Sequence, residues 1–241
     1  MKHILITGAS SGIGKAVASL YANEGHTVYA GGRDFKKLNL LCRSNNKIRP
    51  FICDITDIND IELASKSLPK LDIIILNAGD CEYIDDPINF DGQLFARIIN
   101  TNLISVGYCL QVLLKHLKPN GNLAFTSSSA AFLPLTRTQA YGASKAGLNY
   151  LAKSLSIDLK THNINVSLIN PGFVSTPLTD KNTFSMPGII SSDLAAKYIV
   201  KGLNKNKSEI NIPPLFTFIM KLFSYLPFFI WQKIAVRMIQ K

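Results

Sequence analysis

Acidic residues are scarce in this sequence of 241 residues, and they are missing altogether from its end. There are 26 Lys and Arg against 16 Asp and Glu, a formal net charge of +10. The last acid is Glu209, so the stretch from Asn211 to Lys241 carries four cations without an opposing charge. Such an excess suggests an anionic partner. The remaining net charge of +6 is spread over 210 residues without a basic run or interleaved aromatic residues, which argues against nucleic acid.

Cysteine is also rare, and its spacing excludes two further classes. The four cysteines (Cys42, Cys53, Cys81 and Cys109) form no C-x-x-C pair and have no histidine cluster nearby. We therefore expect no metal site and no disulfide framework, but reduced thiols in a cytoplasmic protein. The first residues, MKHILITGAS, lack a small-residue cleavage site, so we expect a buried strand there and no signal peptide.

Charged residues make up only 17% of the chain and hydrophobic residues 47%, which excludes a disordered protein. No linker and no internal repeat interrupts an alternation of apolar runs with helical periodicity. Strands are predicted at 4–6, 26–30, 48–53, 71–76, 123–126, 164–169 and 209–212, and helices at 15–23, 34–43, 57–68, 90–117, 139–160 and 192–203. Runs such as Asp72-Ile-Ile-Ile-Leu76 suit strands covered on both faces. The pattern predicts an α/β fold, a Rossmann-type doubly wound parallel sheet of about seven strands, over residues 1–212.

A glycine-rich turn follows the first predicted strand. Thr7-Gly8-Ala9-Ser10-Ser11-Gly12-Ile13-Gly14 places three glycines between a strand and a helix. At such a turn the backbone can approach a pyrophosphate at the positive end of the helix. A plain tight turn would explain this motif taken alone.

A second motif carries acid–base chemistry. Tyr141 and Lys145 are four residues apart in a predicted helix, so the phenol and the ammonium share one face. A free tyrosine has a pKa of about 10, and a fixed cation beside it would favour the phenolate. Ser128 lies thirteen residues before Tyr141 at the end of a predicted strand.

Together these motifs resemble the short-chain dehydrogenase/reductase family, in its short single-domain branch. The T-G-x-x-x-G-x-G turn, Asn77-Ala78-Gly79 after a strand, Asn102, Ser128, the Y-x-x-x-K pair and Pro171-Gly-Phe-Val-Ser-Thr176 occur in the family's order. The resemblance implies that Asn102, Ser128, Tyr141 and Lys145 are the catalytic residues. It implies that the cofactor is bound by Gly8, Ser10, Ser11, Gly12, Ile13, Gly14, Arg33, Asp54, Asn77, Ala78, Gly79, Tyr141, Lys145, Pro171, Gly172, Val174 and Thr176. It further implies a homo-oligomer, dimer or tetramer, formed through the helices at 90–117 and 139–160.

The end of the second strand bears on the choice of nicotinamide cofactor. NAD enzymes place an acid there for the ribose hydroxyls, but this chain has Gly32, followed by Arg33. A guanidinium suits a 2′-phosphate, so NADP(H) is favoured over NAD(H). Asp34 keeps NAD open, because it could reach the ribose, although it also suits the N-cap of the next helix.

Residues 213–241 form a hydrophobic, basic appendage for which we predict helices. It holds seven of the 22 aromatic residues. Residues 212–231 could in principle span a bilayer, but Pro213, Pro214, Pro227 and Lys221 argue against a simple spanning helix. Two readings stay open: peripheral contact with the inner face of a membrane, or a lid or subunit contact within the protein.

The expected function is NADP(H)-dependent interconversion of a carbonyl and an alcohol by hydride transfer, on an apolar small molecule and without a metal. Leu178, Phe184 and Met186 in the expected substrate loop favour such a substrate. The alternatives are an NAD-dependent alcohol dehydrogenase, which Asp34 leaves open, and a non-catalytic, membrane-attached NADP-binding sensor.

Overall fold

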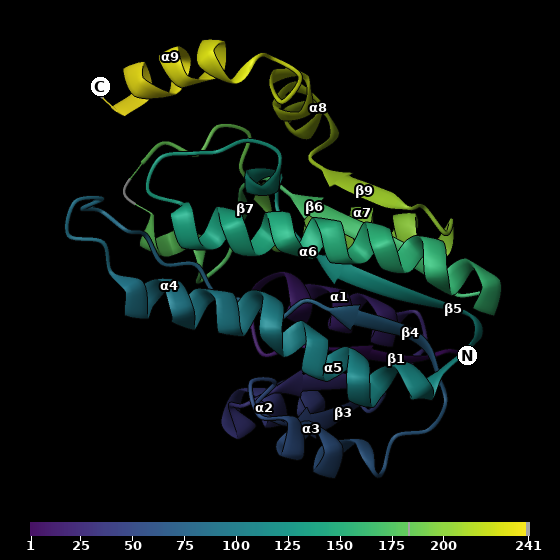
Figure 1. Ribbon diagram of the computed structural model, residues 1–241. Coiled ribbons are helices and arrows are strands. Elements are labelled where there is room, and N and C mark those ends of the chain that lie inside the picture. The colour runs from purple at the N-terminus through teal and green to yellow at the C-terminus, as the bar shows by residue number, and fades with distance from the viewer. Residues whose placement is uncertain (183, 240–241) are drawn as a thin grey trace.

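The computed structural model of the chain describes residues 1–182 and 184–239. Its centre is a sheet of seven parallel strands in the order β3-β2-β1-β4-β5-β6-β9 (Figure 1). The strands are β1 (His3–Ile6), β2 (Thr27–Gly32), β3 (Ile48–Ile52), β4 (Leu71–Leu76), β5 (Leu117–Thr126), β6 (Asn165–Pro171) and β9 (Glu209–Ile212). The order reverses between β1 and β4, and ligands of such sheets bind at that point. The predicted Rossmann-type fold with about seven strands is confirmed.

Helices cover both faces of the sheet. One face carries α1 (Gly12–Asn23), α2 (Phe35–Ser44) and α7 (Ser192–Asn204), and the other carries α3 (Ile58–Ser65), α4 (Gly92–Ile99), α5 (Ser105–Leu113) and α6 (Gln139–Asp158). Four of them begin at a side chain that accepts a hydrogen bond from the first turn: Asp34, Asp57, Asp91 and Ser191. These caps satisfy N–H groups that a helix start would otherwise leave without partners.

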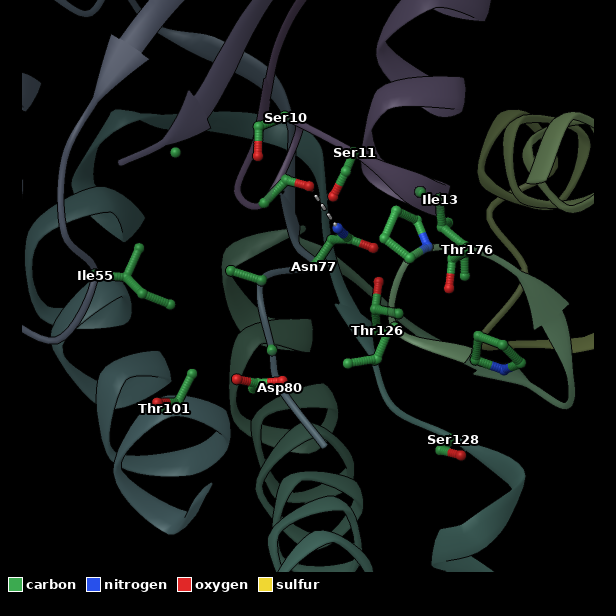
Figure 2. Close-up of a pocket in the computed structure, with 18 of the residues that line it drawn as sticks. Ser10, Ser11, Ile13, Ile55, Asn77, Asp80, Thr101, Thr126, Ser128 and Thr176 are labelled. Atoms are coloured by element: carbon green, nitrogen blue, oxygen red, sulfur yellow. Dashed lines mark hydrogen bonds between the residues drawn. The ribbon is translucent and has the colours of Figure 1, made fainter. Parts of the chain in front are cut away.

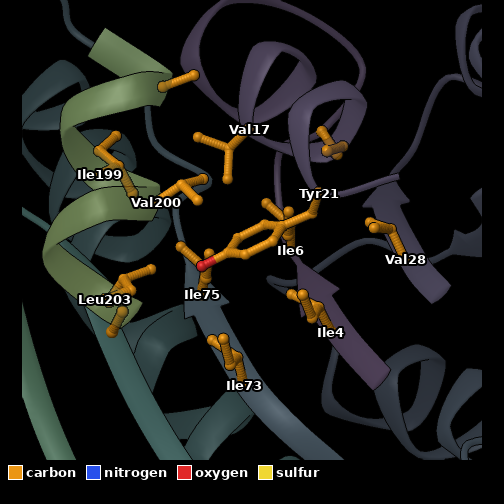
Figure 3. Packing of buried hydrophobic residues seen from close by; sticks show 14 of the residues in the cluster. Ile4, Ile6, Val17, Tyr21, Val28, Ile73, Ile75, Ile199, Val200 and Leu203 are labelled. Carbon is orange, nitrogen blue, oxygen red and sulfur yellow. The ribbon is translucent and has the colours of Figure 1, made fainter. Parts of the chain in front are cut away.

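The sheet divides the core into two apolar layers. In the layer under α1 and α7, the fully buried Tyr21 reaches from α1 across β1 toward α7 (Figure 3). Burial raises the pKa of its phenol, which therefore stays neutral and packs as an apolar ring. Both layers consist mainly of Ile, Leu and Val, whose branched side chains suit strands buried on both faces.

The helix predicted at 90–117 is interrupted. Between α4 and α5 the chain makes one π-helical turn, η1 (Asn100–Ile104), where the N–H of Ser105 donates to the oxygen of Asn100. The whole stretch from Gly92 to His116 is the one described helix with the length and apolar composition of a membrane span. It packs against α3 and α6 within the fold, as a core helix does.

The segment after β6 is less irregular than predicted. It contains β7 (Val174–Ser175), a 3-10 turn η5 (Thr179–Lys181) and β8 (Ile190–Ser191), and β7 and β8 pair in parallel as a second small sheet.

The predicted C-terminal helices are present as α8 (Pro214–Phe223) and α9 (Phe228–Ile239). At a rise of about 1.5 Å per residue they are roughly 15 and 18 Å long, so neither spans a bilayer of about 30 Å. Trp231 fastens α9 to the body, because its indole N–H donates to the oxygen of Pro134 at 2.8 Å.

Candidate active site

A pocket of about 350 Å³ opens at the carboxyl ends of the strands, where the sheet order reverses. In Figure 2, Ser10 lies at one end of it and Ser128 at the other. With two exceptions, Gly14 and Asn102, every residue that the sequence suggested for catalysis or cofactor binding lines this pocket. Residues from six strand ends and the turns that follow them are thus brought together. The two exceptions lie directly behind the wall.

The three glycines of the turn lie where a side chain has little or no room. Gly8 and Gly12 have positive φ angles, +66° and +52°, which favour glycine. A Cβ on Gly8 would lie 2.8 Å from the Cα of Ala78, and one on Gly14 would lie 2.3 Å from the oxygen of Gly8. The turn therefore packs directly on the chain after β4 and presents bare backbone at the N-terminus of α1, as a pyrophosphate requires.

Thr7 holds this junction together. Its buried hydroxyl oxygen accepts hydrogen bonds from the N–H groups of Asn77 (2.9 Å) and Ala78 (3.1 Å). In return, Nδ2 of Asn77 donates to the oxygen of Thr7 at 3.1 Å. Thr7 is absent from the predicted site, although its place in the turn motif is the signal that could have found it.

At the end of the pocket near Ser10, the site has a positively charged side chain, Arg33. Strand β2 contributes no acidic side chain there. Arg33 is largely exposed, with 75% of its side chain accessible, and its Nη1 lies 3.3 Å from Oδ2 of Asp54. Asp34 caps α2 by accepting from the N–H of Lys37 at 3.0 Å, and its carboxylate also lies 3.4 Å from the Lys37 ammonium. These contacts hold the pKa of Asp34 below its usual range. Asp34 thus has the ordinary capping role.

Asn102 lies in the π-helical turn and supports the wall from behind. Its amide oxygen accepts from the N–H of Asp80 at 2.8 Å, and its amide nitrogen donates to the oxygen of Asp80 (2.8 Å) and to the hydroxyl of Ser144 (3.0 Å). Its side chain thus joins the chain after Gly79 to α6.

Ser128, Tyr141 and Lys145 meet at the other end of the pocket. Lys145 is buried, and its ammonium donates to the oxygen of Thr126 at 2.9 Å and lies 5.7 Å from the centre of the Tyr141 ring. Burial lowers the pKa of Lys145 to about 8. Of the three neighbouring serines, Ser127 turns inward to the oxygen of Lys145, whereas Ser128 faces the Tyr141 phenol.

The expected lowering of the tyrosine pKa is not found in this structure. Burial raises the pKa of Tyr141, the nearby Cys81 thiol raises it further, and hydrogen bonding to Ser128 only partly opposes them. The spacing of Tyr141 and Lys145 indicates the nearby cation but not the loss of water around the phenol, which has the larger effect on the pKa here. Tyr141 is therefore a neutral phenol, able to donate a proton.

Aromatic side chains lie close to Tyr141, outside the set of residues that line the pocket. The hydroxyl of Tyr83 donates to Asn182 at 2.8 Å, and its ring meets that of Phe184 edge-on, with centroids 5.8 Å apart. Cys81 lies between the two tyrosines, and burial raises its pKa to about 11, so it is a neutral thiol.

Several lining residues were not predicted. Thr126 and Thr179 are examples: the Thr126 hydroxyl is buried without a hydrogen-bond partner in the described chain, and the Thr179 hydroxyl fixes the loop by donating to Val174 at 2.7 Å. The glycine cradle, the Thr126 hydroxyl and the Lys145 ammonium fit a phosphorylated, hydroxyl-bearing cofactor. Residues 1–182 and 184–239 contain no group of His, Cys, Asp and Glu that could hold a metal.

Known proteins are similar to this chain in sequence and in fold. Residues 2–186 match the family described as short chain dehydrogenase. An uncharacterized oxidoreductase of Myxococcus xanthus is 31% identical over 87% of this chain and 86% of its own length. The 3-oxoacyl-[acyl-carrier-protein] reductase FabG of Thermotoga maritima is 33% identical over 75% of this chain and 77% of its own.

Two solved structures have the same fold at low identity. A short-chain dehydrogenase/reductase from Burkholderia phymatum in complex with NAD superimposes with a TM-score of 0.81, at 19% identity over 92% of each chain. A short-chain dehydrogenase from Sphingobium yanoikuyae in complex with NADPH gives 0.78, at 21% identity over 94% of this chain and 97% of that one. The family match covers the glycine turn, the N-A-G element and the Y-x-x-x-K pair, and with it the protein is a member of the short-chain dehydrogenase/reductase family, an NAD(P)-dependent oxidoreductase.

Proposed function

We propose that the protein is an NADP(H)-dependent oxidoreductase that interconverts a ketone or aldehyde and an alcohol on an apolar small molecule. The observation that carries this proposal is the meeting of Ser128, Tyr141 and Lys145 at one end of a pocket whose other end presents Arg33. The two ends suit the two ends of a dinucleotide, the reacting ring and the 2′-phosphate.

The proposed reaction uses the chain's own groups for positioning and proton transfer. The Ser128 hydroxyl donates a hydrogen bond to the substrate carbonyl oxygen, and the neutral Tyr141 phenol gives that oxygen a proton. Lys145 holds the ribose hydroxyls, and Asn102 anchors the wall that carries a water of the proton relay. NADPH, when bound, supplies the hydride. A neutral Tyr141 matches the reducing direction, in which the residue acts as an acid.

Three features support NADP(H) over NAD(H). Gly32 occupies the place of the acid that accepts from ribose hydroxyls, and a Cβ there would meet only ordinary contacts, the nearest at 3.6 Å. The space beside Ser10 is therefore open to a phosphate. Arg33 offers charge-assisted hydrogen bonds there, and Asp34 is turned toward Lys37.

The substrate end supports an apolar compound. Tyr83, Phe184 and Leu178 border the region beside Tyr141. The FabG relative is named for reducing a 3-oxoacyl group, and an acyl chain, a steroid-like ketone or a long-chain aldehyde would each suit such walls.

The proposal is tested by titrating the purified protein with NADPH and NADH and then following cofactor oxidation with long-chain aldehydes and ketones. We expect Tyr141→Phe to lose most turnover while binding NADPH nearly as before. Tyr198→Phe, which changes an exposed tyrosine on α7 away from the pocket, is the matched control. Near-normal turnover of Tyr141→Phe would refute the assigned role, and cofactor binding without turnover on any substrate would favour the sensor.

We also propose an assembly and a location. Residues 1–212, ending with β9, form the cofactor-binding and catalytic unit, and residues 213–241 form its appendage. Tyr150 and Ile157, exposed and seven residues apart on α6, support a homo-oligomer formed through that helix and α4–α5. Light scattering of Ile157→Asp, compared with wild type, tests it. The proposed location is the cytoplasm, with peripheral contact to the inner face of a membrane.

A further inference from the structure

Helix α8 exposes a stripe of apolar side chains and turns polar ones inward, the reverse of an ordinary surface helix. Its apolar stripe, Leu215, Phe218, Ile219 and Leu222, has the i, i+3, i+4, i+7 spacing that normally faces a core. Here these side chains are 73%, 65%, 41% and 57% exposed.

The polar residues of α8 point to the body instead. Thr217 is fully buried, and its hydroxyl donates to the oxygen of Pro213 at 2.8 Å. Lys221 forms an ion pair with Glu209 and lies 5.3 Å above the ring of Phe132. The contacts of Thr217 and Lys221 thus fix the orientation of α8. Its apolar stripe faces away from the body of the protein.

The exposed surface continues beyond α8. Tyr225, Phe228 and Phe229 are 84%, 62% and 61% exposed, whereas Trp231 is turned inward. We call the stripe of α8 together with these three aromatic residues the tail face. In Figure 1, α8 and α9 lie at the outer edge of the molecule, beyond β9.

The charges around the tail face indicate which kind of partner fits it. No acid follows Glu209 in the sequence, and the Glu209 carboxylate is already paired with Lys221. Lys233 and Arg237 on α9 are exposed. A two-fold contact between copies of this chain would bring these cations together without an acid to oppose them, whereas an anionic lipid surface would attract them.

We propose that the tail face seats in the interface of an anionic bilayer, with α8 and α9 lying in the membrane plane. Their lengths exclude spanning, and Phe and Leu beside Lys and Arg are the residues of interfacial helices.

A row of aromatic side chains connects α8 with Tyr141, the proposed catalytic tyrosine. Phe216, on the body side of α8, lies 5.6 Å from Phe173, which lies 6.1 Å from Phe184, which lies 5.8 Å from Tyr83 beside Tyr141 (centroid distances). Resting on the proposed function, this aromatic chain assigns the substrate to carbonyl compounds dissolved in the lipid.

Lipid binding is tested by sedimentation with vesicles of phosphatidylcholine alone or mixed equally with phosphatidylglycerol. Wild type is expected to bind the mixed vesicles, and Leu215→Ser/Leu222→Ser to lose that binding. Leu40→Ser/Leu63→Ser, which changes leucines of similar exposure on α2 and α3, is expected to bind as wild type does. Circular dichroism checks that each variant is folded.

Lys233→Gln/Arg237→Gln tests the charge. At about fivefold in partition coefficient for each basic residue near anionic lipid, it is expected to bind mixed vesicles roughly 25-fold more weakly. Equal vesicle binding by Leu215→Ser/Leu222→Ser and wild type would overturn the proposal. So would a wild-type dimer that ignores vesicles and dissociates in that variant, since the face would then hold a second copy.

Substrate delivery is tested by comparing a short, water-soluble aldehyde with a long-chain aldehyde dissolved in the mixed vesicles. Leu215→Ser/Leu222→Ser is expected to keep kcat/KM for the soluble aldehyde and to lose it for the vesicle-bound one. Equal loss on both would overturn delivery from lipid. Wild type that binds vesicles but oxidises NADPH with neither aldehyde would contradict the proposed function and leave the membrane face standing.

Discussion

Replacing Arg33 with alanine separates the two nicotinamide cofactors. The guanidinium lies at the end of β2 that faces Ser10, and the only acid it meets among the described residues is Asp54, at 3.3 Å. This ion pair is exposed, and such pairs contribute little to stability, so Arg33→Ala should leave the fold intact. Its effect should fall on the ligand that carries a 2′-phosphate.

The expected size follows from the kind of bond that is lost. Hydrogen bonds to charged groups contribute about 1.5–3 kcal/mol, which corresponds to roughly a 10- to 150-fold change in Kd. Because three quarters of the Arg33 side chain is exposed, we expect the lower part of that range for NADPH. The Kd for NADH, which has no 2′-phosphate, should change less than threefold, or by less than about 0.7 kcal/mol.

Fluorescence titration of Arg33→Ala with both cofactors measures the two constants. Gly32→Asp is the reciprocal variant: the pocket has room for its Cβ, and the carboxylate should weaken NADPH binding and strengthen NADH binding. Parallel weakening of both cofactors by Arg33→Ala, or wild-type preference for NADH, would refute the reasoning.

Three further predictions concern the walls of the pocket. Thr7→Ala removes the acceptor of two backbone N–H groups and should lower the free energy of unfolding in urea by about 1–3 kcal/mol, whereas Thr7→Ser should restore it; equal stability of both variants would contradict this. Because burial lowers the pKa of Lys145 from 10.5 to about 8, the cost of the buried charge is fully present below pH 8 and disappears as the pH rises to 10.5. Lys145→Met should therefore stabilise the fold more below pH 8 than above pH 10.5, and a stability difference independent of pH would argue against it. Gly14→Ala would set a methyl group 2.3 Å from a backbone oxygen and should abolish NADPH binding, while Gly107→Ala, with open space around it, should bind normally; measured Kd values decide.

Much of the fold and of the pocket could be predicted because the signals are local. The four-residue apolar run at 73–76, a glycine with no room for a Cβ and an i, i+4 pair of side chains can each be recognised within a few residues of sequence. The parallel sheet then places the ends of its strands along one edge. Arg33 and Tyr141 come together in one pocket for this reason, although they are more than a hundred positions apart in the sequence.

The features that could not be predicted from the sequence depend on tertiary contacts. The apolar periodicity runs unbroken through Asn102, so it does not reveal the π-helical turn. The direction of the Tyr141 pKa depends on how much water the fold removes, which spacing does not report. The stripe of α8 has the spacing of a buried face, and only its neighbours show that Thr217 and Lys221 take the inside.

The packing of Phe216 on Gly172 has a thermodynamic consequence for the whole molecule. A Cβ at Gly172 would lie 2.6 Å from the Phe216 ring, so α8 rests directly on the segment that borders the pocket. A displacement of α8 would therefore move that backbone as well, and the tail and the cofactor would then be coupled. Such coupling is reciprocal: if vesicles tighten NADPH binding tenfold, NADPH must tighten vesicle binding tenfold, a coupling free energy of about 1.4 kcal/mol. The cell's supply of reduced cofactor would then govern how much of the enzyme resides on the membrane.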